Sequence, residues 1–267
     1  MRVLSPRAEC APAAAALVAA IALSAGPAAA STAETSAGAS AAPAAAWALS
    51  GPGVWSPANP GGFGAFANTR SSNWSGYAAN TGTYTSVSAS WVQPAVTCGE
   101  SSEAVFWVGL DGWGSDTVEQ DGSGAYCSGS TPHYYAWWET YPANSIQQYT
   151  KTVKAGDHFT ATVTYKGGGK YLMTVADSTQ GWTENTNATS SSATRSSAEV
   201  IAEAPSGSGG REALADFGKV SFTGSMVDGT ALSNSSPTAI NMYSGGLDAS
   251  TTKLSSTENF KVTWKNY

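Results

Sequence analysis

Short runs in which apolar and polar residues alternate fill the chain from residue 71 onward. Alternation places neighbouring side chains on opposite faces of an extended strand, so one face can be buried. The clearest runs are rich in Thr, Val, Tyr and Trp, which favour strands: 83–92, 104–110, 133–141, 158–165, 171–176, 198–202, 239–243 and 260–264. No segment shows the period of about 3.6 residues of an amphipathic helix. The pattern therefore predicts an all-β fold.

Short gaps rich in Gly, Asn, Asp and Ser separate these runs, as expected for turns. One run places Phe159, Ala161, Val163 and Tyr165 on one face, and three glycines, 167–169, lead to the next run. This spacing predicts an antiparallel hairpin. Many short antiparallel strands in one block predict a single β-sandwich or barrel over residues 71–267.

The first 70 residues differ in composition from the rest. Residues 1–30 are typical of a secretory signal peptide, with Arg2 and Arg7 ahead of the 15-residue apolar stretch 11–25 and small residues before Ser31. A membrane anchor is the alternative, but a bilayer span needs about 20 apolar residues. Residues 31–70 are rich in Ala, Ser, Gly and Pro and predict a disordered linker or pro-segment. We therefore expect a secreted protein that is free of the membrane after cleavage of the signal.

Charged residues are scarce. They make up 12 % of the chain, with 13 Lys+Arg against 19 Asp+Glu and a net charge of −6, whereas soluble domains usually have ~25 %. Nucleic-acid binding needs a basic surface, so we expect no nucleic-acid partner.

The cysteines fit an exported protein. Cys10 lies in the predicted signal, which leaves Cys98 and Cys127 to form a disulfide in an oxidising compartment. Two buried thiols are the alternative.

Several chemistries lack their motifs. There is no Gly-x-Ser-x-Gly elbow, no His-Glu-x-x-His helix and no phosphate-binding loop. His133 and His158 lie in strand-like runs beside aromatic residues, which favours structural roles. The acidic segment 111–121 has the composition of a calcium loop but not its spacing. We therefore expect no bound metal.

Two carboxylates, Glu199 and Glu203, lie four residues apart just before Pro205. In a regular strand they share a face and lie about 13 Å apart. That is wider than the ~5–9.5 Å of a glycosidase pair, so a catalytic role would need a partner from elsewhere. The spacing alone favours two solvent-facing carboxylates.

Five segments, taken together and in order, resemble motifs of the glutamic peptidases, also called eqolisins. They are SNWSGY at 72–77, WVGLDG at 107–112, VEQDG at 118–122, YAWWETYP at 135–142 and AEVIAE at 198–203. Each motif alone is weak, but five in order at compatible spacing are specific. The similarity covers about residues 71–267, and the family fold is an antiparallel β-sandwich of jelly-roll, lectin-like (concanavalin-like) character.

The resemblance implies that Gln120 and Glu203 are the catalytic pair. It also implies a supporting or substrate-binding shell of four residues: Trp74, Asp111, Glu139 and Tyr141. The alternative for these four is aromatic and polar packing beneath a groove. Glu199 also matches a family position, and we interpret it as structural.

The resemblance further implies an acid-acting endopeptidase without metal, cofactor or covalent intermediate. Its partners would be protein or peptide substrates, and we expect a monomer. Low charge suits such an enzyme, because few ion pairs are lost in acid and the fold should survive at about pH 3. Three positions depart from the family pattern: Asp121, Thr140 and Ala204. We expect the Asp121 carboxylate to raise the pKa of a neighbouring acid.

Two other classes of function remain open at this point. The same sandwich could be a carbohydrate-binding module or glycosidase, with exposed Trp and Tyr side chains as sugar platforms. It could also be a secreted binding protein without catalytic activity.

Overall fold

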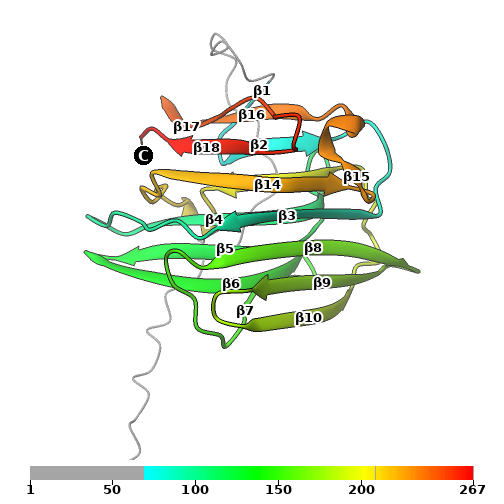
Figure 1. Ribbon diagram of the computed structural model, residues 1–267, viewed down its shortest axis with the longest axis horizontal. Helices are drawn as coiled ribbons and strands as arrows, with labels where there is room; N and C mark the ends of the chain where they lie inside the picture. The colour runs from blue at the N-terminus through cyan, green and yellow to red at the C-terminus, as the bar shows by residue number, and fades with distance from the viewer. Residues whose placement is uncertain (1–68, 208, 267) are drawn as a thin grey trace, which may run out of the picture. The chain divides into compact units, whose positions relative to one another are not determined.

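The computed structural model describes residues 69–207 and 209–266 (Figure 1). The predicted signal peptide, residues 1–30, and nearly all of the predicted linker or pro-segment, 31–70, lie outside this part of the chain. Strands dominate the described residues, where the one helix is the short 3-10 turn Leu232–Ser235. No helix in this part is long and apolar enough to cross a membrane. The all-β prediction is confirmed.

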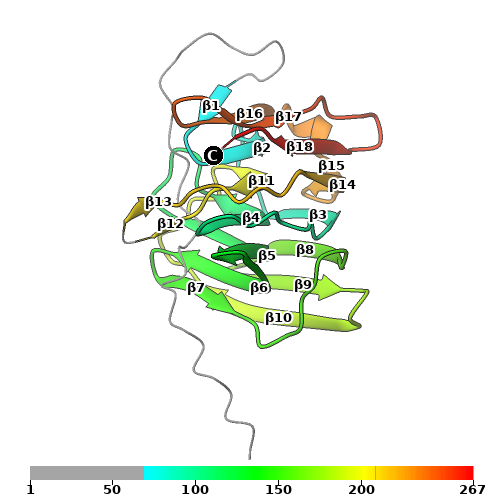
Figure 2. The same ribbon diagram turned by 90° about the vertical axis from the view of Figure 1, so that its left-hand side faces the viewer.

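One path of hydrogen-bonded strands folds into two stacked layers, which Figure 2 shows side by side. The first layer contains, in spatial order, β16 (Thr238–Tyr243), β2 (Trp74–Ala79), β11 (Ala198–Glu203), β4 (Ser102–Asp111), β5 (Val118–Ser128), β6 (Thr131–Tyr141) and β7 (Asn144–Gln148). The second contains β10 (Trp182–Thr189), β9 (Lys170–Asp177), β8 (His158–Gly167), β3 (Ser86–Val92), β14 (Lys219–Val227), β18 (Phe260–Trp264) and β17 (Leu247–Thr251). Tyr77 of β2 meets Phe260 of β18 across the core, with ring centroids 4.8 Å apart. The short strands are β1 (Thr69–Ser71), β12 (Ser206–Gly207), β13 (Gly210–Arg211) and β15 (Thr230–Ala231). All neighbouring strands on the path are antiparallel, as the sandwich prediction requires.

Strand β14 is bent within the second layer. Its first half pairs with β18, up to Phe222 opposite Phe260, and its second half pairs with β3 from Thr223 onward. The register shifts between Thr223 and Met226, and Gly224 at φ +58° lies in this bulge. A bulge bends and twists a strand, so β14 can pair with β18 and β3 in turn. The path passes to the first layer where β17 pairs with β16.

The core lies between the layers and follows the alternation. The predicted face of β8 is buried at Phe159, Ala161 and Val163. Trp91 of β3 stacks on Phe159 with ring centroids 6.0 Å apart, and Phe106 of β4 lies in the same core. The predicted hairpin is the antiparallel pair β8 and β9.

Three long strands were not among the predicted runs. β5 contains the acidic, glycine-rich segment that resembles a loop in composition, yet it pairs with β4 and β6 along its whole length. β10 is mostly polar, with Trp182 and Ala188 as its apolar residues, and as the last strand of its layer it buries no side chain fully. β14 is interrupted by its bulge. In each case pairing with neighbouring strands outweighs a weak local pattern.

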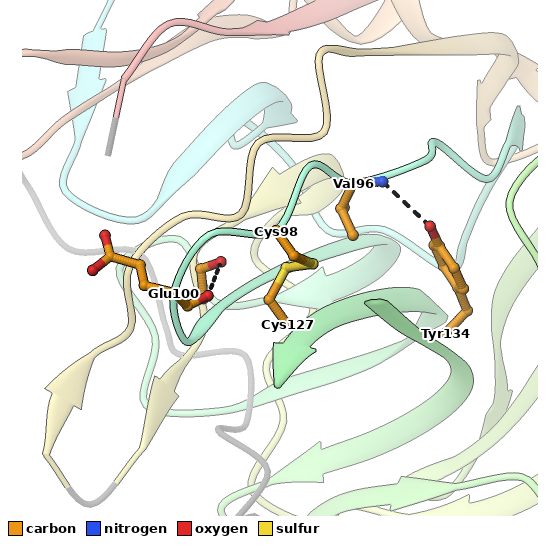
Figure 3. The surroundings of a disulfide bond; sticks show 6 residues. Val96, Cys98, Glu100, Cys127 and Tyr134 are labelled. Atoms are coloured by element: carbon orange, nitrogen blue, oxygen red, sulfur yellow. Dashed lines mark hydrogen bonds between the residues drawn. A yellow bond between two sulfur atoms is a disulfide. The ribbon is translucent and has the colours of Figure 1, made fainter. Parts of the chain in front are cut away.

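The predicted disulfide is present between Cys98 and Cys127, whose Cα atoms lie 5.5 Å apart (Figure 3). It joins the segment before β4 to the end of β5, the strand that carries Gln120. Beside it, the backbone N–H of Val96 donates to the Tyr134 hydroxyl. The chain between the two cysteines is therefore the β4–β5 hairpin rather than a loop.

Candidate active site

Backbone pairing aligns chemically distinct side chains on one face of the first layer. One row across β11, β4, β5 and β6 contains Glu199, Gly109, Gln120 and Glu139. The next row on the same face contains Ile201, Trp107, Gly122 and Trp137. Residues paired across antiparallel strands point to the same side. We call this side the site face; it includes Trp74, Glu203, Trp107, Gln120, Trp137 and Glu139, and it lies opposite the sandwich core.

Glu203 ends β11 on the site face, opposite Trp74 of β2 and Val105 of β4. Its Oε1 accepts a hydrogen bond from Asn73 Nδ2 at 3.0 Å, and its Oε2 accepts one from Trp107 Nε1 at 2.9 Å. Both Glu199 and Glu203 are buried. The solvent-facing interpretation of these two carboxylates is therefore wrong, because spacing fixes the shared face but not what covers it.

Aromatic side chains surround the Glu203 carboxylate. Trp74 meets Trp107 edge to face, with ring centroids 5.1 Å apart. Both belong to a buried apolar cluster that also contains Trp137 and Ile201. Such surroundings lower the local dielectric and strengthen each hydrogen bond to the carboxylate.

Gly109 makes room for this arrangement. A Cβ at Gly109 would lie 2.8 Å from the Trp107 ring and 3.1 Å from Gln120 Cβ. The glycine of the WVGLDG motif therefore lets the indole and the glutamine lie side by side across β4 and β5.

Gln120 and Glu139 occupy directly opposed positions on β5 and β6. Gln120 Nε2 donates to Glu139 Oε2 at 2.8 Å. Burial raises the pKa of Glu139 to about 8, against the opposing effect of the hydrogen bond from Gln120. Glu139 is therefore a neutral acid in an acidic medium, and its contact fixes the orientation of the Gln120 amide.

Glu199 lies in the same row as Gln120. Among the residues that the structure describes, no cation pairs with its carboxyl group. Burial raises its pKa well above the ordinary value, and the charges of Asp111 and Glu119 raise it further. Glu199 is therefore a neutral, buried carboxyl at low pH, as its structural interpretation requires.

Asp111 ends β4 in the left-handed region, at φ +67°. Its carboxylate accepts hydrogen bonds from Thr194 Oγ1 at 2.8 Å, from the Ser196 N–H at 2.8 Å and from the Arg195 N–H at 2.5 Å. These contacts fix the segment before β11, and none of them involves Gln120 or Glu203. Asp111 thus supports the site through the backbone.

Tyr141, the last residue of β6, lies on the same side of that strand as Glu139. Its side chain is 39 % exposed, and it is the one large aromatic residue in the described chain that is well exposed. It is therefore accessible to a bound ligand.

With this geometry in place, comparison with known protein families matches residues 72–264 to the peptidase A4 family. The chain belongs to this family. Its members are the glutamic peptidases, or eqolisins, so the sequence resemblance and the enzyme class are confirmed. The protein is a glutamic peptidase, a hydrolase that acts on peptide bonds.

Solved structures of glutamic peptidases share its fold. Scytalido-glutamic peptidase with a transition state analog inhibitor is 25 % identical with a TM-score of 0.65, and the match covers 73 % of this chain and 98 % of that one. Aspergilloglutamic peptidase from Aspergillus niger is 25 % identical at a TM-score of 0.55, over 61 % and 99 % of the two chains. SCP-B, an eqolisin in complex with the tripeptide Ala-Ile-His, is 24 % identical with a TM-score of 0.60, and the match covers 73 % of this chain and 98 % of that one. No curated protein sequence matches this chain significantly.

Asp121, one of the departures from the family pattern, does not lie near the site face of this glutamic peptidase. It follows Gln120 in β5 and so points to the opposite side, where it is buried in the sandwich. Burial raises the pKa of Asp121 itself well above the ordinary value. The charge of Asp121 helps to raise the pKa of Tyr149, after burial as the main cause. It is not among the causes of the raised pKa of Glu139, the acid beside Gln120.

Sequence reasoning missed a contact that this glutamic peptidase makes at Glu203. Asn73 lies in the SNWSGY motif but was not identified as a site residue. Its position directly before Trp74 was the available signal. The contact itself depends on pairing between β2 and β11, which are 130 residues apart at this point.

Proposed function

We propose that this glutamic peptidase is a secreted, acid-acting endopeptidase in which Glu203 and Gln120 perform the hydrolysis. One observation carries the proposal. On one buried face, both carboxylate oxygens of Glu203 accept hydrogen bonds from N–H donors. On the same face, Glu139 orients the amide of Gln120. The site face thus holds a carboxylate that can act as a base and an amide that can act as a donor.

The proposed reaction uses one proton in two steps. Ionised Glu203 takes a proton from a water molecule, whose oxygen attacks the carbonyl carbon of the peptide bond. Gln120 Nε2 donates to the oxygen that becomes negative, an interaction typically worth ~3–4 kcal/mol. Glu203 then returns the proton to the leaving amine as the carbon–nitrogen bond breaks.

Acid operation follows from the ordinary pKa of Glu, ~4.3, because one carboxyl that acts first as base and then as acid works best near that value. Glu139 supports the same conclusion, since it remains neutral below about pH 8. Secretion rests on the signal-like composition of residues 1–30.

The supporting residues have separable roles in this proposal. Trp74 excludes water from Glu203, Glu139 orients Gln120, and Asp111 anchors the segment before β11. Tyr141 is exposed at the end of β6 and would contact the substrate.

Protein and peptide substrates are the proposed partners of a monomeric enzyme that needs no cofactor. Two structural relatives support the substrate class, since one was solved with a peptide-based transition state analog and another with a tripeptide.

Substitution of the pair tests the proposal. Glu203→Gln and Gln120→Ala should each abolish cleavage of denatured casein at about pH 4, while circular dichroism shows an intact fold. Glu184→Gln is the matched control, because Glu184 lies on the outer strand β10 and pairs with Lys151 at 2.7 Å. It should keep wild-type activity. Full activity of Glu203→Gln would overturn the assignment.

A further inference from the structure

Asn73 is a buried amide that touches the proposed catalytic carboxylate. It immediately precedes β2 and is 3 % exposed. Its Nδ2 lies 3.0 Å from Glu203 Oε1 and donates to it. The family resemblance places Asn73 in a motif, but this contact is a property of the folded chain.

Ser71 fixes which end of the Asn73 amide faces Glu203. Ser71 Oγ accepts from the backbone N–H groups of Asn73 at 3.2 Å and Trp74 at 3.1 Å. Both lone pairs of the hydroxyl are then used, so its own hydrogen is left to donate. It donates to Asn73 Oδ1 at 2.8 Å. With Oδ1 held by a donor, the NH₂ end must point at Glu203.

The other oxygen of Glu203 faces a second pure donor. Trp107 Nε1 lies 2.9 Å from Oε2, and an indole N–H cannot accept a hydrogen bond. Each carboxylate oxygen therefore meets a group that can only donate. A proton on either oxygen would weaken the hydrogen bond that this oxygen accepts, so the pair of donors favours the ionised carboxylate.

Other charged and titratable groups also face Glu203. Arg211 of β13 interacts with its charge and is paired with Asp248 at 2.8 Å. Tyr135 of β6 interacts with it as well, but burial keeps Tyr135 neutral and its hydroxyl donates to Glu103 of β4. Of the two groups that interact with Glu203 here, Arg211 is the one that carries a positive charge. Substitution of Asn73 leaves all of them in place, so the contribution of the amide can be measured separately.

We propose that Ser71 and Asn73 form a positioning relay that keeps Glu203 a carboxylate in acid and thereby sets the lower pH limit of peptide hydrolysis. The inference rests on the proposed function, in which Glu203 is the base. Ser71 orients the amide, the amide holds Oε1, and Trp107 holds Oε2. Neither Ser71 nor Asn73 touches the substrate in this role.

The pH dependence of kcat/KM tests the relay, because its acid limb reports the ionisation of the essential base in the free enzyme. The measurement uses the protein produced from the full chain and an internally quenched peptide from about pH 2 to 7, a range that spans the ordinary Glu pKa. In Asn73→Leu the acid limb should move upward by about one pH unit or more, as expected for the loss of one hydrogen bond to a charged group. Activity should recover above the shifted limb.

Ser71 gives a second, milder test that does not depend on the folding of Asn73→Leu. Ser71→Ala removes the donor to Asn73 Oδ1 and should move the limb in the same direction by a smaller amount. Ser71→Thr retains the hydroxyl and should restore the wild-type position of the limb.

Asn241 is the matched control. It is a buried asparagine of β16 whose Oδ1 accepts the Thr251 backbone N–H at 2.7 Å. Asn241→Leu should lower the melting temperature without moving the acid limb. An equal limb shift in Asn241→Leu and Asn73→Leu would overturn the relay, because the effect would then be a general loss of packing.

Failure of the relay and failure of the proposed function give different results. If Glu203→Gln is inactive and Asn73→Leu keeps the wild-type limb with a lower kcat, the relay is wrong and Glu203 remains the base. If Glu203→Gln is active, the proposed function is wrong, and with it the basis of the relay.

Discussion

Gln120 and Glu139 are opposed across β5 and β6, and the amide Nε2 donates to the carboxyl Oε2 at 2.8 Å. A neutral acid thus holds the amide that we propose as the oxyanion donor. The amide has two N–H groups, and this contact uses one of them. We propose the other as the donor to the substrate, in the orientation that Glu139 imposes.

Substitution of Glu139 removes the acceptor that orients Gln120, so the Gln120 amide should lose its fixed orientation. We expect Glu139→Leu to lower kcat about 10- to 100-fold, the range typical of a misplaced catalytic group, with a smaller change in KM. Steady-state kinetics on a peptide substrate at about pH 4 would measure it. In Glu139→Gln, the amide oxygen still accepts from Gln120, so most of the activity should remain. Equal losses in both variants would show that the carboxyl has another role.

Stability should fall as the pH rises. Burial raises the pKa of both Glu119 and Glu139 from 4.5 to about 8. Between these values the folded chain keeps protons that the unfolded chain releases, so the free energy of unfolding decreases with pH. The stabilisation is fully present below about pH 4.5 and is lost as the pH approaches 8.

Urea unfolding followed by tryptophan fluorescence at pH 4 and pH 8 would measure this dependence. We expect the free energy of unfolding to be lower at pH 8 by at least ~2 kcal/mol. Greater stability at pH 8 than at pH 4 would contradict the buried-acid account.

Asp121, which faces the sandwich core, should contribute to the same pH dependence of the free energy of unfolding. It is fully buried, and this burial raises its pKa well above the ordinary value. Asp121→Asn cannot ionise, so it should raise the melting temperature at pH 8 more than at pH 4. The exposed Asp116→Asn is the control and should change neither. Identical effects of Asp121→Asn at both pH values would refute the prediction.

The short distance between Gly109 and the Trp107 ring predicts that a side chain at position 109 would lower activity through a steric clash. In Gly109→Ala the new Cβ would press on the Trp107 ring, so the indole must move and its N–H must leave Glu203. We expect kcat/KM to fall about 100-fold, because small displacements of catalytic groups are costly. Gly99→Ala makes the same change where nothing lies within 4 Å and should be neutral. Comparable kinetics of the two variants would rule out this account.

The alternation of residues was sufficient to predict the all-β class, because burial of one face of each strand leaves a direct trace in the sequence. It identified β8 and β9 with the hairpin between them. It could not identify β5, whose pattern of Glu119, Gln120 and Asp121 is polar on both faces. The burial of that strand is a property of its neighbours β4 and β6.

The site was predicted in part. Family motifs pointed to Gln120, Glu139 and Glu203, and the structure places all three on one face. The residues could not show that Glu203 is buried or that Asn73 bonds to it, because both facts depend on strands that are distant in the chain. Nor could they show that Asp111 acts on the backbone before β11.

Strand β5 also limits how this enzyme can vary in length. Gln120 faces the proposed catalytic side, while Glu119 and Asp121 face the sandwich core. Insertion or deletion of one residue upstream in the strand would shift its register and exchange these faces. An acid would then occupy the place of the amide, and the amide would be buried in the core. Length changes among related enzymes should therefore be confined to the hairpin ends, where Ser128 and Thr131 lead into the next strand.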